Sequence, residues 1–310
     1  MTSGHAFEAS AGFARARPPT FDKQVKEGAH GGTMGSPWFA DPVRTGEGRE
    51  ITVPVALTIA SSDSGGGAGI QADLKAFAHS DCYGASVIVA LTAQNTRGVS
   101  AIHECPPAFV RAQLEAVFDD LPVGAAKTGM LFSAAIVETV ADYLAEHRVP
   151  LVVDPVMVAS SGAKLLRDDA VDALVHRLFP LATVITPNLP EAQALTGMDV
   201  ENRRALAERL HDLGAAAVVI TGGHGERPVE HFFDGERHLE IPVPRHEVAA
   251  THGAGCTHSA TLAALLARGE ELEAAVGMAS IVAAWAVEHG LDELGGGDGP
   301  VDVFNLKGTR

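Results

Sequence analysis

Residues 53–79 read VPVALTIASSDSGGGAGIQADLKAFAH, a β-branched run followed by a glycine-rich turn and an amphipathic helical pattern. This succession is the repeating unit of a parallel sheet with crossover helices. Similar runs predict strands at Val53–Ala60, Ala85–Leu91, Leu151–Asp154, Thr183–Thr186 and Ala216–Thr221. Helical patterns lie between and after them, at Ile70–His79, Ala108–Phe118, Ala134–His147, Asp168–Leu178, Arg203–Leu213, Thr257–Ala267 and Leu272–His289. The sequence therefore predicts a doubly wound α/β fold, with a mostly parallel central sheet and helices on both faces.

Composition narrows the class of protein. The 310 residues are 46% hydrophobic and 20% charged, enough for a sizeable core in one large domain or two small ones. The formal net charge of −16 argues against nucleic-acid and membrane-surface partners, because both require a basic face. Three cysteines without a C-x-x-C pair predict a reducing compartment, with cytoplasm as the default. No segment approaches the roughly 20 uninterrupted apolar residues of a membrane span.

Residues 1–50 differ from the rest of the chain. They are rich in Gly, Pro, Ser and Thr and show no apolar periodicity, which predicts a disordered tail. They lack the continuous apolar region of a secretory signal, and Glu8, Asp22 and Glu27 argue against a transit peptide. Met34 is an alternative start. We therefore place the folded domain at residues 51–310.

A second glycine-rich turn, THGAGCT at 251–257, runs into an apolar helical pattern and places Cys256 at the helix start. Glycine lets the backbone approach a phosphate, and the helix N-terminus favours negative charge. The same dipole favours a thiolate, so this segment could hold a phosphoryl group and supply a base or nucleophile. A tight structural connection is the alternative interpretation.

The first glycine-rich turn, Ser61–Gly69, does not fit the common nucleotide motifs. A G-x-G-x-x-G motif that begins at Gly65 would require glycine at Ile70, and the chain contains no Gly-Lys-Ser or Gly-Lys-Thr. Without a lysine for nucleotide phosphates, this turn is better interpreted as a substrate-side loop. A flexible strand-to-helix turn is the alternative.

Polar residues follow other expected strands, at the edge where parallel sheets bind ligands. Gln94, Asp154 and Asn188 each occupy such a position. Asn188 and Glu191 are three residues apart at a helix start, where an amide and a carboxylate can hold hydrated Mg²⁺ through its water shell. The same spacing is that of an N-cap and its capping-box glutamate, which is a purely structural alternative.

Together these segments resemble the ribokinase-like superfamily and, within it, the hydroxymethylpyrimidine/phosphomethylpyrimidine kinase family of thiamine biosynthesis. The resemblance extends from about Val55 to about Ala267, and the joint order of its individually weak motifs is highly specific. The motifs are ALTIA at 56–60, GGAGIQADLK at 66–75, AQNT at 93–96, KTGML at 127–131, DPVM at 154–157, ITPNLPEA at 185–192, GGH at 222–224 and HGAGCT at 252–257.

The resemblance implies ATP-dependent phosphorylation of 4-amino-5-hydroxymethyl-2-methylpyrimidine, and then of its monophosphate to the diphosphate. Gln94 would read the aminopyrimidine edge, because an amide presents a donor and an acceptor side by side. The implied substrate pocket is formed by Ser61, Asp73, Gln94, Met130 and Val156. Met130 and Val156 are alternatively ordinary core residues.

Phosphoryl transfer requires alignment, charge neutralisation and removal of the hydroxyl proton. The resemblance implies that amides around Gly253 and Gly255 stabilise the transferring group, and that Cys256 activates the substrate hydroxymethyl group. The implied cofactors are ATP and Mg²⁺. ATP would be held by Asn188, Glu191, Gly223 and Ala254, and the metal by Asp154 and Glu191.

Four positions depart from the family pattern: Ser61 stands in place of glycine, Ala254 of threonine, His258 of leucine and Thr221 of lysine. His258 could tune the Cys256 thiolate, or it is a partly exposed helix histidine.

Two other functions stay open. A pyridoxal or pyridoxine kinase shares the cysteine and acts on a hydroxymethyl group of an aromatic ring, and a catalytically idle pyrimidine-binding protein would keep the pocket alone. Relatives of this kind often pair. We therefore expect a cytoplasmic homodimer whose ligands are the small-molecule substrate and ATP.

Overall fold

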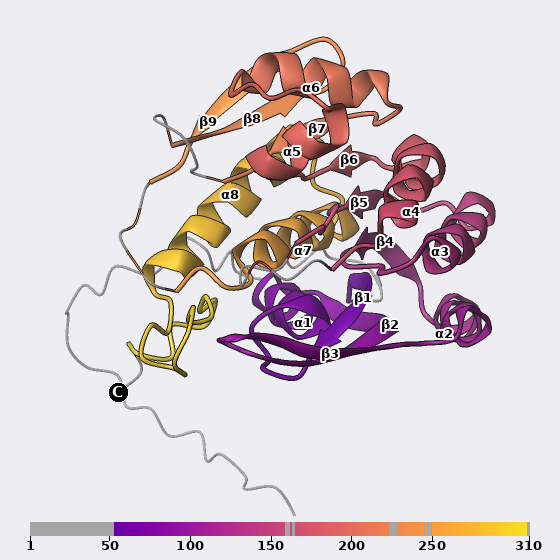
Figure 1. Ribbon diagram of the computed structural model, residues 1–310, viewed down its shortest axis with the longest axis horizontal. Coiled ribbons are helices and arrows are strands. Elements are labelled where there is room, and N and C mark those ends of the chain that lie inside the picture. Colours follow the sequence, from indigo (N-terminus) through magenta and orange to yellow (C-terminus); the bar gives the residue numbers. More distant parts are fainter. Residues whose placement is uncertain are drawn as a thin grey trace, which may run out of the picture. The chain divides into compact units, whose positions relative to one another are not determined.

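The computed structural model describes residues 53–158, 162, 165–222, 228–244, 246, 248 and 250–308. The predicted tail at 1–50 and its boundary therefore lie outside the described residues. Within the described part, nine strands form one sheet in the order β3-β2-β1-β4-β5-β6-β7-β8-β9 (Figure 1). The strands are β1 (Val55–Asp63), β2 (Tyr83–Asn95), β3 (Gly98–Glu104), β4 (Val123–Thr128), β5 (Leu151–Val153), β6 (Val184–Ile185), β7 (Val218–Ile220), β8 (Val229–Phe233) and β9 (His238–Pro242).

The centre of the sheet is parallel. Strand β1 pairs in parallel with β2 on one side and β4 on the other, and β5, β6 and β7 continue in the same direction. Antiparallel strands extend both edges, β3 beside β2 and the β8–β9 hairpin beside β7. The prediction of a mostly parallel, doubly wound sheet is confirmed. The strand order reverses at β1, and ligands bind at such a switch point in open α/β sheets.

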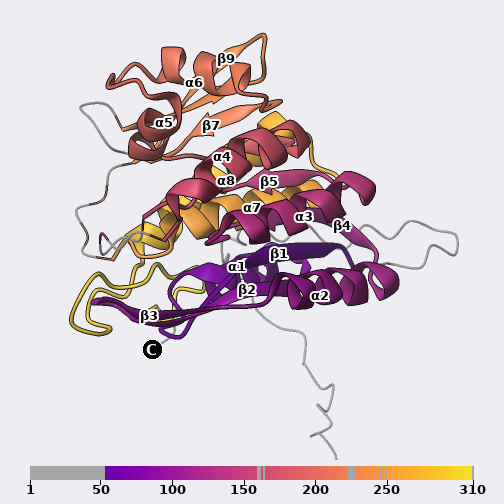
Figure 2. The same ribbon diagram turned by 45° about the vertical axis from the view of Figure 1, so that its right-hand side comes forward.

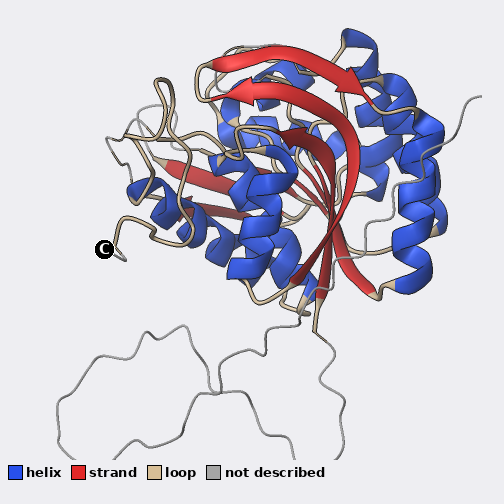
Figure 3. Ribbon diagram, turned by 90° about the horizontal axis from the view of Figure 1, so that it is seen from below, coloured by secondary structure: helices blue, strands red, loops and turns tan. Residues whose placement is uncertain are grey.

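Helices cover both faces of the sheet (Figure 3). One face packs against α1 (Gly69–His79), α7 (Ala254–Ala267) and α8 (Leu272–Glu288), with α7 and α8 side by side in Figure 2. The other face is covered by α2 (Pro107–Asp120), α3 (Ala134–Glu146), α4 (Asp168–Ala173), α5 (Leu189–Thr196) and α6 (Arg203–Asp212). Among the described helices, none has the length and apolar character needed to cross a membrane.

Strand alternation builds a separate core on each face. In β5, Val152 packs among the buried residues of α1, α7 and α8, whereas Val153 packs on the opposite side. Val219 and Val218 of β7 divide in the same way. Because successive side chains of a strand point to opposite faces, a continuous apolar run is the pattern expected of a sheet buried on both sides.

The structure differs from the predicted elements in several places. Strand β1 continues to Asp63, so Ser61–Asp63 belong to the strand and not to the following turn. Strands β3, β4, β8 and β9 were not predicted. In β4 the sequence contains Lys127, which suggests solvent exposure, yet this side chain is fully buried. The predicted helix 168–178 is α-helical only to Ala173 and ends in a π-helical turn, Leu174–Leu178.

Candidate active site

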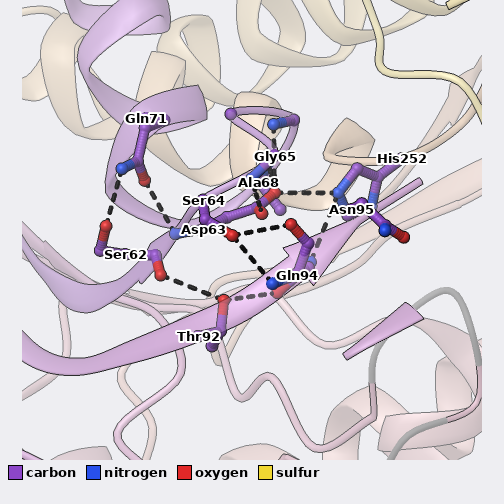
Figure 4. A network of polar contacts seen from close by, with 12 residues as sticks. Ser62, Asp63, Ser64, Gly65, Ala68, Gln71, Thr92, Gln94, Asn95 and His252 are labelled. Atoms are coloured by element: carbon purple, nitrogen blue, oxygen red, sulfur yellow. Dashed lines mark hydrogen bonds and ion pairs between the residues drawn. The ribbon is translucent and has the colours of Figure 1, made fainter. Parts of the chain in front are cut away.

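Asp63 organises the segment that follows β1, which we call the glycine loop (Ser64–Ala68). Its Oδ1 accepts a hydrogen bond from the Gly65 N–H at 2.7 Å, and its Oδ2 accepts from Gly67 at 3.1 Å and Ala68 at 2.9 Å (Figure 4). Burial would raise the pKa of Asp63, but the hydrogen bond from His252 and those from the loop outweigh it and lower the pKa below its usual value. Asp63 is therefore a carboxylate at neutral pH.

Gln94 lies at the end of β2 beside the glycine loop. Its backbone N–H donates to Ser64 Oγ at 2.8 Å, and Ser64 Oγ donates to the Gln94 carbonyl at 2.7 Å. The Thr92 hydroxyl donates to Gln94 Oε1 at 3.0 Å. The half-buried amide is thus held in place with part of its hydrogen-bonding capacity unused. This is the arrangement that the predicted base-reading role requires, and the role itself stays a prediction.

The other predicted pocket residues lie at neighbouring strand ends. Ser61 Oγ lies 3.2 Å from Met130 Sδ, and each residue is only 5% exposed. Val156, after β5, is half-buried. The structure therefore brings Ser61 and Met130 together. Substrate contact at all three positions stays a prediction.

Asp73 takes part in a fully buried ion pair with Lys127. Lys127 Nζ lies 2.9 Å and 3.1 Å from the two carboxylate oxygens of Asp73, and the Thr58 hydroxyl donates to Oδ2 at 2.6 Å. Burial would lower the pKa of Lys127, but Asp73 together with Cys256 and Asp154 outweighs it and raises that pKa above its usual range. The Asp73 oxygens are thus engaged by protein groups, and a contact of Asp73 with substrate stays a prediction.

Asp154 extends this charged group toward α7. Its Oδ2 accepts from Ser259 Oγ at 2.8 Å and lies 3.9 Å from Lys127 Nζ. Burial raises the pKa of Asp154 despite the nearby ammonium group. Lys127 is a cation beneath the helix N-terminus that sequence reasoning overlooked. The charged residue inside the apolar β4 run was the available signal.

Asn188 and Glu191 form the capping box that the sequence offered as a structural alternative. Asn188 Oδ1 accepts from the Glu191 N–H at 2.9 Å, and Glu191 Oε2 accepts from the Asn188 N–H at 3.0 Å. Glu191 Oε1 also accepts from the Met157 N–H at 3.3 Å. Burial and the charge of Asp154 raise the pKa of Glu191 to about 8, although these backbone N–H groups lower it. The capping box is confirmed.

A divalent cation fits the chemistry of Asp154 and Glu191. Lys127 lies closer to Asp73, at 2.9 Å, than to Asp154, at 3.9 Å, so one ammonium group serves both carboxylates, and Glu191 adds a third carboxyl group that Asp154 repels. Within the described ranges no three His, Cys, Asp or Glu side chains are grouped as metal ligands. Mg²⁺ commonly takes only one or two carboxylates and completes its shell with water and phosphate. The residues present therefore suit Mg²⁺ held in that manner.

The segment Thr251–Thr257, which we call the cysteine turn, leads into α7. Gly253 is the N-cap and adopts a left-handed φ of 85°, and Cys256 lies in the first helical turn with its side chain partly exposed. Burial raises the pKa of the Cys256 thiol to about 12, although Lys127 and the Gly69 N–H lower it. Desolvation therefore acts against the thiolate while the helix dipole and Lys127 favour it, and the role of Cys256 as a base stays a prediction.

The structure also shows the surroundings of His258 and Thr221, two of the positions that depart from the family pattern. His258 is not partly exposed: it is 2% exposed and its Nε2 lies 3.2 Å from Glu230 Oε2. Thr221 is buried and its N–H donates to the Pro187 carbonyl beside Asn188. Gly223 lies outside the described residues, and Ala254 is half-buried in the first turn of α7.

Comparison with known proteins identifies the family. The model of the family described as phosphomethylpyrimidine kinase matches residues 63–302. The chain belongs to this family. It is 49% identical over 259 residues to the hydroxymethylpyrimidine/phosphomethylpyrimidine kinase of Rhizobium meliloti, covering 81% of this chain and 97% of that protein. It is 50% identical over 252 residues to a bifunctional thiamine-biosynthesis protein of Geobacter sulfurreducens. That match covers 79% of this chain and 51% of the other protein, so the chain spans about half the length of that relative.

Solved structures agree with the fold. An ADP complex of Bacillus subtilis pyridoxal kinase gives a TM-score of 0.76 at 38% identity, covering 83% of this chain and 99% of that one. A phosphomethylpyrimidine kinase from Clostridium difficile gives a TM-score of 0.66 at 40% identity, covering 73% and 96%. The predicted ribokinase-like fold class, the predicted family and the predicted kinase activity are therefore confirmed. As a kinase, the protein is a transferase.

Proposed function

We propose that this phosphomethylpyrimidine kinase family member transfers the γ-phosphoryl group of ATP to 4-amino-5-hydroxymethyl-2-methylpyrimidine in thiamine biosynthesis. The monophosphate is then phosphorylated to the diphosphate at the same site. One observation carries the proposal: the Gln94 amide lies 3.5 Å from the ring of His252, the residue directly before the N-cap of α7. A group suited to the aminopyrimidine edge thus adjoins a helix N-terminus suited to phosphate.

Each group has a role in the transfer. Gln94 orients the ring, and Ser61, Met130, Val156 and Asp73 complete the pocket. The N–H groups that follow Gly253, with Lys127 beneath them, stabilise the charge that develops on the transferring phosphoryl group. Cys256 takes the proton of the substrate hydroxyl as the new bond forms. Its thiol pKa of about 12 makes it a strong acceptor once ionised, although the ionised fraction is small near neutral pH.

The nucleotide side is formed by Asn188, Glu191, Ala254 and Gly223. Asp154 and Glu191 would hold Mg²⁺, which would neutralise phosphate charge. Solved relatives include the pyridoxal kinase of Staphylococcus aureus in complex with AMP-PCP and pyridoxal, which supports ATP as the phosphate donor. A cytoplasmic homodimer completes the proposal, and sedimentation equilibrium of the purified protein tests its dimeric state.

Pyridoxal kinase is the second candidate, because the solved pyridoxal kinases from Bacillus subtilis and Staphylococcus aureus have TM-scores of 0.74 to 0.76 with this chain. ADP release by purified protein with ATP and Mg²⁺ separates the candidates when hydroxymethylpyrimidine, its monophosphate and pyridoxal are compared. We expect turnover of both pyrimidines, and its loss in Cys256→Ala. A preference for pyridoxal would favour the second candidate, and binding without turnover would indicate an idle binding protein.

A further inference from the structure

We propose that Asp63 and His252 form a clamp that fixes the glycine loop against the cysteine turn, which makes His252 a positioning residue for the reaction. The inference rests on the proposed function, because these two segments are the ones assigned to the pyrimidine side and to the phosphoryl group. The paired atoms are Asp63 Oδ2 and His252 Nε2, 3.1 Å apart and almost completely buried (Figure 4).

Asp63 does more than organise its own loop. Three backbone N–H groups of the glycine loop already satisfy both carboxylate oxygens. The bond to His252 is additional and reaches a residue 189 positions further along the chain. Because a hydrogen bond to a charged group is stronger than one between neutral groups, this contact holds two segments that are distant in the sequence firmly together.

His252 is itself held from its backbone. Its N–H donates to the Gly299 carbonyl at 3.1 Å, and its carbonyl accepts from the Val301 N–H at 3.1 Å. The ring therefore projects toward Asp63 from a backbone fixed on both sides. Gly253 follows directly, so a displacement of His252 is transmitted to the N-cap of α7.

The two segments are also in steric contact. A Cβ on Gly253 would lie 1.9 Å from the Gly67 carbonyl oxygen, and a Cβ on Gly67 would lie 2.3 Å from His252 Cδ2. Both distances are far below van der Waals contact. The glycine loop and the cysteine turn consequently approach as closely as backbone allows, and the clamp holds them at that separation.

The clamp also leaves Gln94 available for a ligand. The Asp63 carboxylate can only accept, so His252 Nε2 carries the hydrogen that lies between them. Gln94 Nε2 is 3.5 Å from His252 Nε2. Because His252 Nε2 carries a hydrogen, it has no free lone pair and cannot accept a hydrogen bond from the Gln94 amide. The Gln94 NH₂ group keeps its hydrogens for the bound ring, while Thr92 orients its oxygen.

The consequence for the reaction is a fixed distance between the base-reading amide and the start of α7. Phosphoryl transfer depends on this alignment, and a displacement of about 1 Å can cost roughly 100-fold in rate. His252 touches neither reacting atom in this scheme. It acts through Gly253 and Gln94.

Amide hydrogen exchange tests the clamp independently of activity. We expect His252→Ala to accelerate exchange in peptides covering 61–69 as well as in those covering 251–257. Asp63→Asn, which keeps the shape of the side chain, should accelerate exchange in both regions too, and it serves if His252→Ala does not fold. His238→Ala is the matched control, because it removes another histidine–carboxylate pair, 3.3 Å from Glu208, far from these segments in the sheet order.

Kinetics supply the second readout. His252→Ala should lower kcat by about 10- to 100-fold, and Asp63→Ala by more, because it also removes the three hydrogen bonds from the glycine loop. The double variant should lose little more than Asp63→Ala alone, because the Asp63–His252 contact is already absent there. His252→Gln, whose amide N–H reaches the same position, should recover most of the rate. Faster exchange confined to the substituted segment, or single losses that multiply in the double variant, would overturn the clamp. A wild-type enzyme inactive on the pyrimidines would contradict the proposed function instead, and the exchange data would still decide on the clamp.

Discussion

Replacing His258 by leucine should destabilise this kinase strongly, because the substitution leaves Glu230 buried without its partner. His258 and Glu230 are 2% and 5% exposed, and their side chains are 3.2 Å apart between α7 and β8. Removal of one member of a buried ion pair costs about 3–5 kcal/mol. In a domain of this size, such a loss corresponds to a fall in Tm of roughly 6–10 °C.

Guanidinium denaturation at pH 6 and 25 °C measures this loss. The double variant His258→Leu/Glu230→Gln should recover at least half of it, because glutamine carries no charge and can still accept from Ser280 Oγ. His103→Leu is the matched control at an exposed histidine, and it should change stability by less than about 0.5 kcal/mol. A loss below about 1 kcal/mol in His258→Leu, or no recovery in the double variant, would refute the reasoning.

The pH dependence provides a signed check on the same pair. Burial lowers the pKa of His258, but Glu230 outweighs it and raises that pKa above 6.5, so the stabilisation is complete below pH 6.5 and is lost as pH rises through the folded pKa. Burial raises the pKa of Glu230, but His258, with Ser280 and the Gly222 N–H, outweighs it and lowers that pKa below 4.5, so this stabilisation is lost on acidification. The pair should therefore contribute most between pH 4.5 and 6.5. Above pH 6.5 the wild type should lose up to about 1.4 kcal/mol per pH unit relative to the double variant.

Three further perturbations address the active site. Cys256→Ala should lower kcat by about 100-fold or more. The wild-type rate should rise with pH between 6 and 9 while the variant rate stays flat, because the thiolate fraction grows about tenfold per pH unit below a pKa of about 12. A steady-state pH profile measures this, and a flat wild-type profile would exclude the base role. Gly253→Ala should lower kcat by about 100-fold, because its Cβ would collide with the Gly67 carbonyl and alanine disfavours the φ of 85° found there. Gly277→Ala is the control, because a Cβ at Gly277 meets no neighbour within 4 Å. Equal rates in the two variants would contradict the close approach of the two segments. The Mg²⁺ concentration for half-maximal rate should fall as pH rises through about 8, where Glu191 ionises, and Glu191→Gln should abolish that pH dependence. Mg²⁺ titrations at pH 6.5 and 8.5 test this prediction. A wild-type half-maximal concentration that does not change with pH would remove Glu191 from the metal site.

Sequence periodicity predicted most of the parallel centre of the fold, but it missed β4 within that centre and the antiparallel strands at the edges. Strands such as β1, β5 and β7 are apolar on both faces because helices cover both sides, and that pattern is visible in the residues alone. Strand β3 is largely exposed or half-buried, and β9 likewise, so neither shows a continuous apolar run. The burial of Lys127 in β4 depends on Asp73, 54 positions away in the chain, and local sequence does not reveal such a partner.

The sequence motifs contain the residues of the candidate site, but they do not reveal the electrostatics of that site. The motifs contained Gln94, Cys256 and Glu191, and the structure places all three at the carboxyl edge of the parallel strands or at a helix start. The desolvation of the Cys256 thiol could not be predicted from the sequence, because the helix dipole is a local property whereas desolvation depends on residues from several elements. Asp63 and His252 lay within the quoted segments, but their pairing emerges only when β1 and α7 are folded together.

The most direct test of the proposed function is ³¹P NMR of the products formed by the purified protein from ATP, Mg²⁺ and hydroxymethylpyrimidine monophosphate. We predict the coupled resonances of a pyrimidine diphosphate, growing in step with ADP and absent without enzyme. ADP production with no pyrimidine diphosphate, or an unchanged monophosphate resonance beside efficient phosphorylation of pyridoxal, would contradict the account.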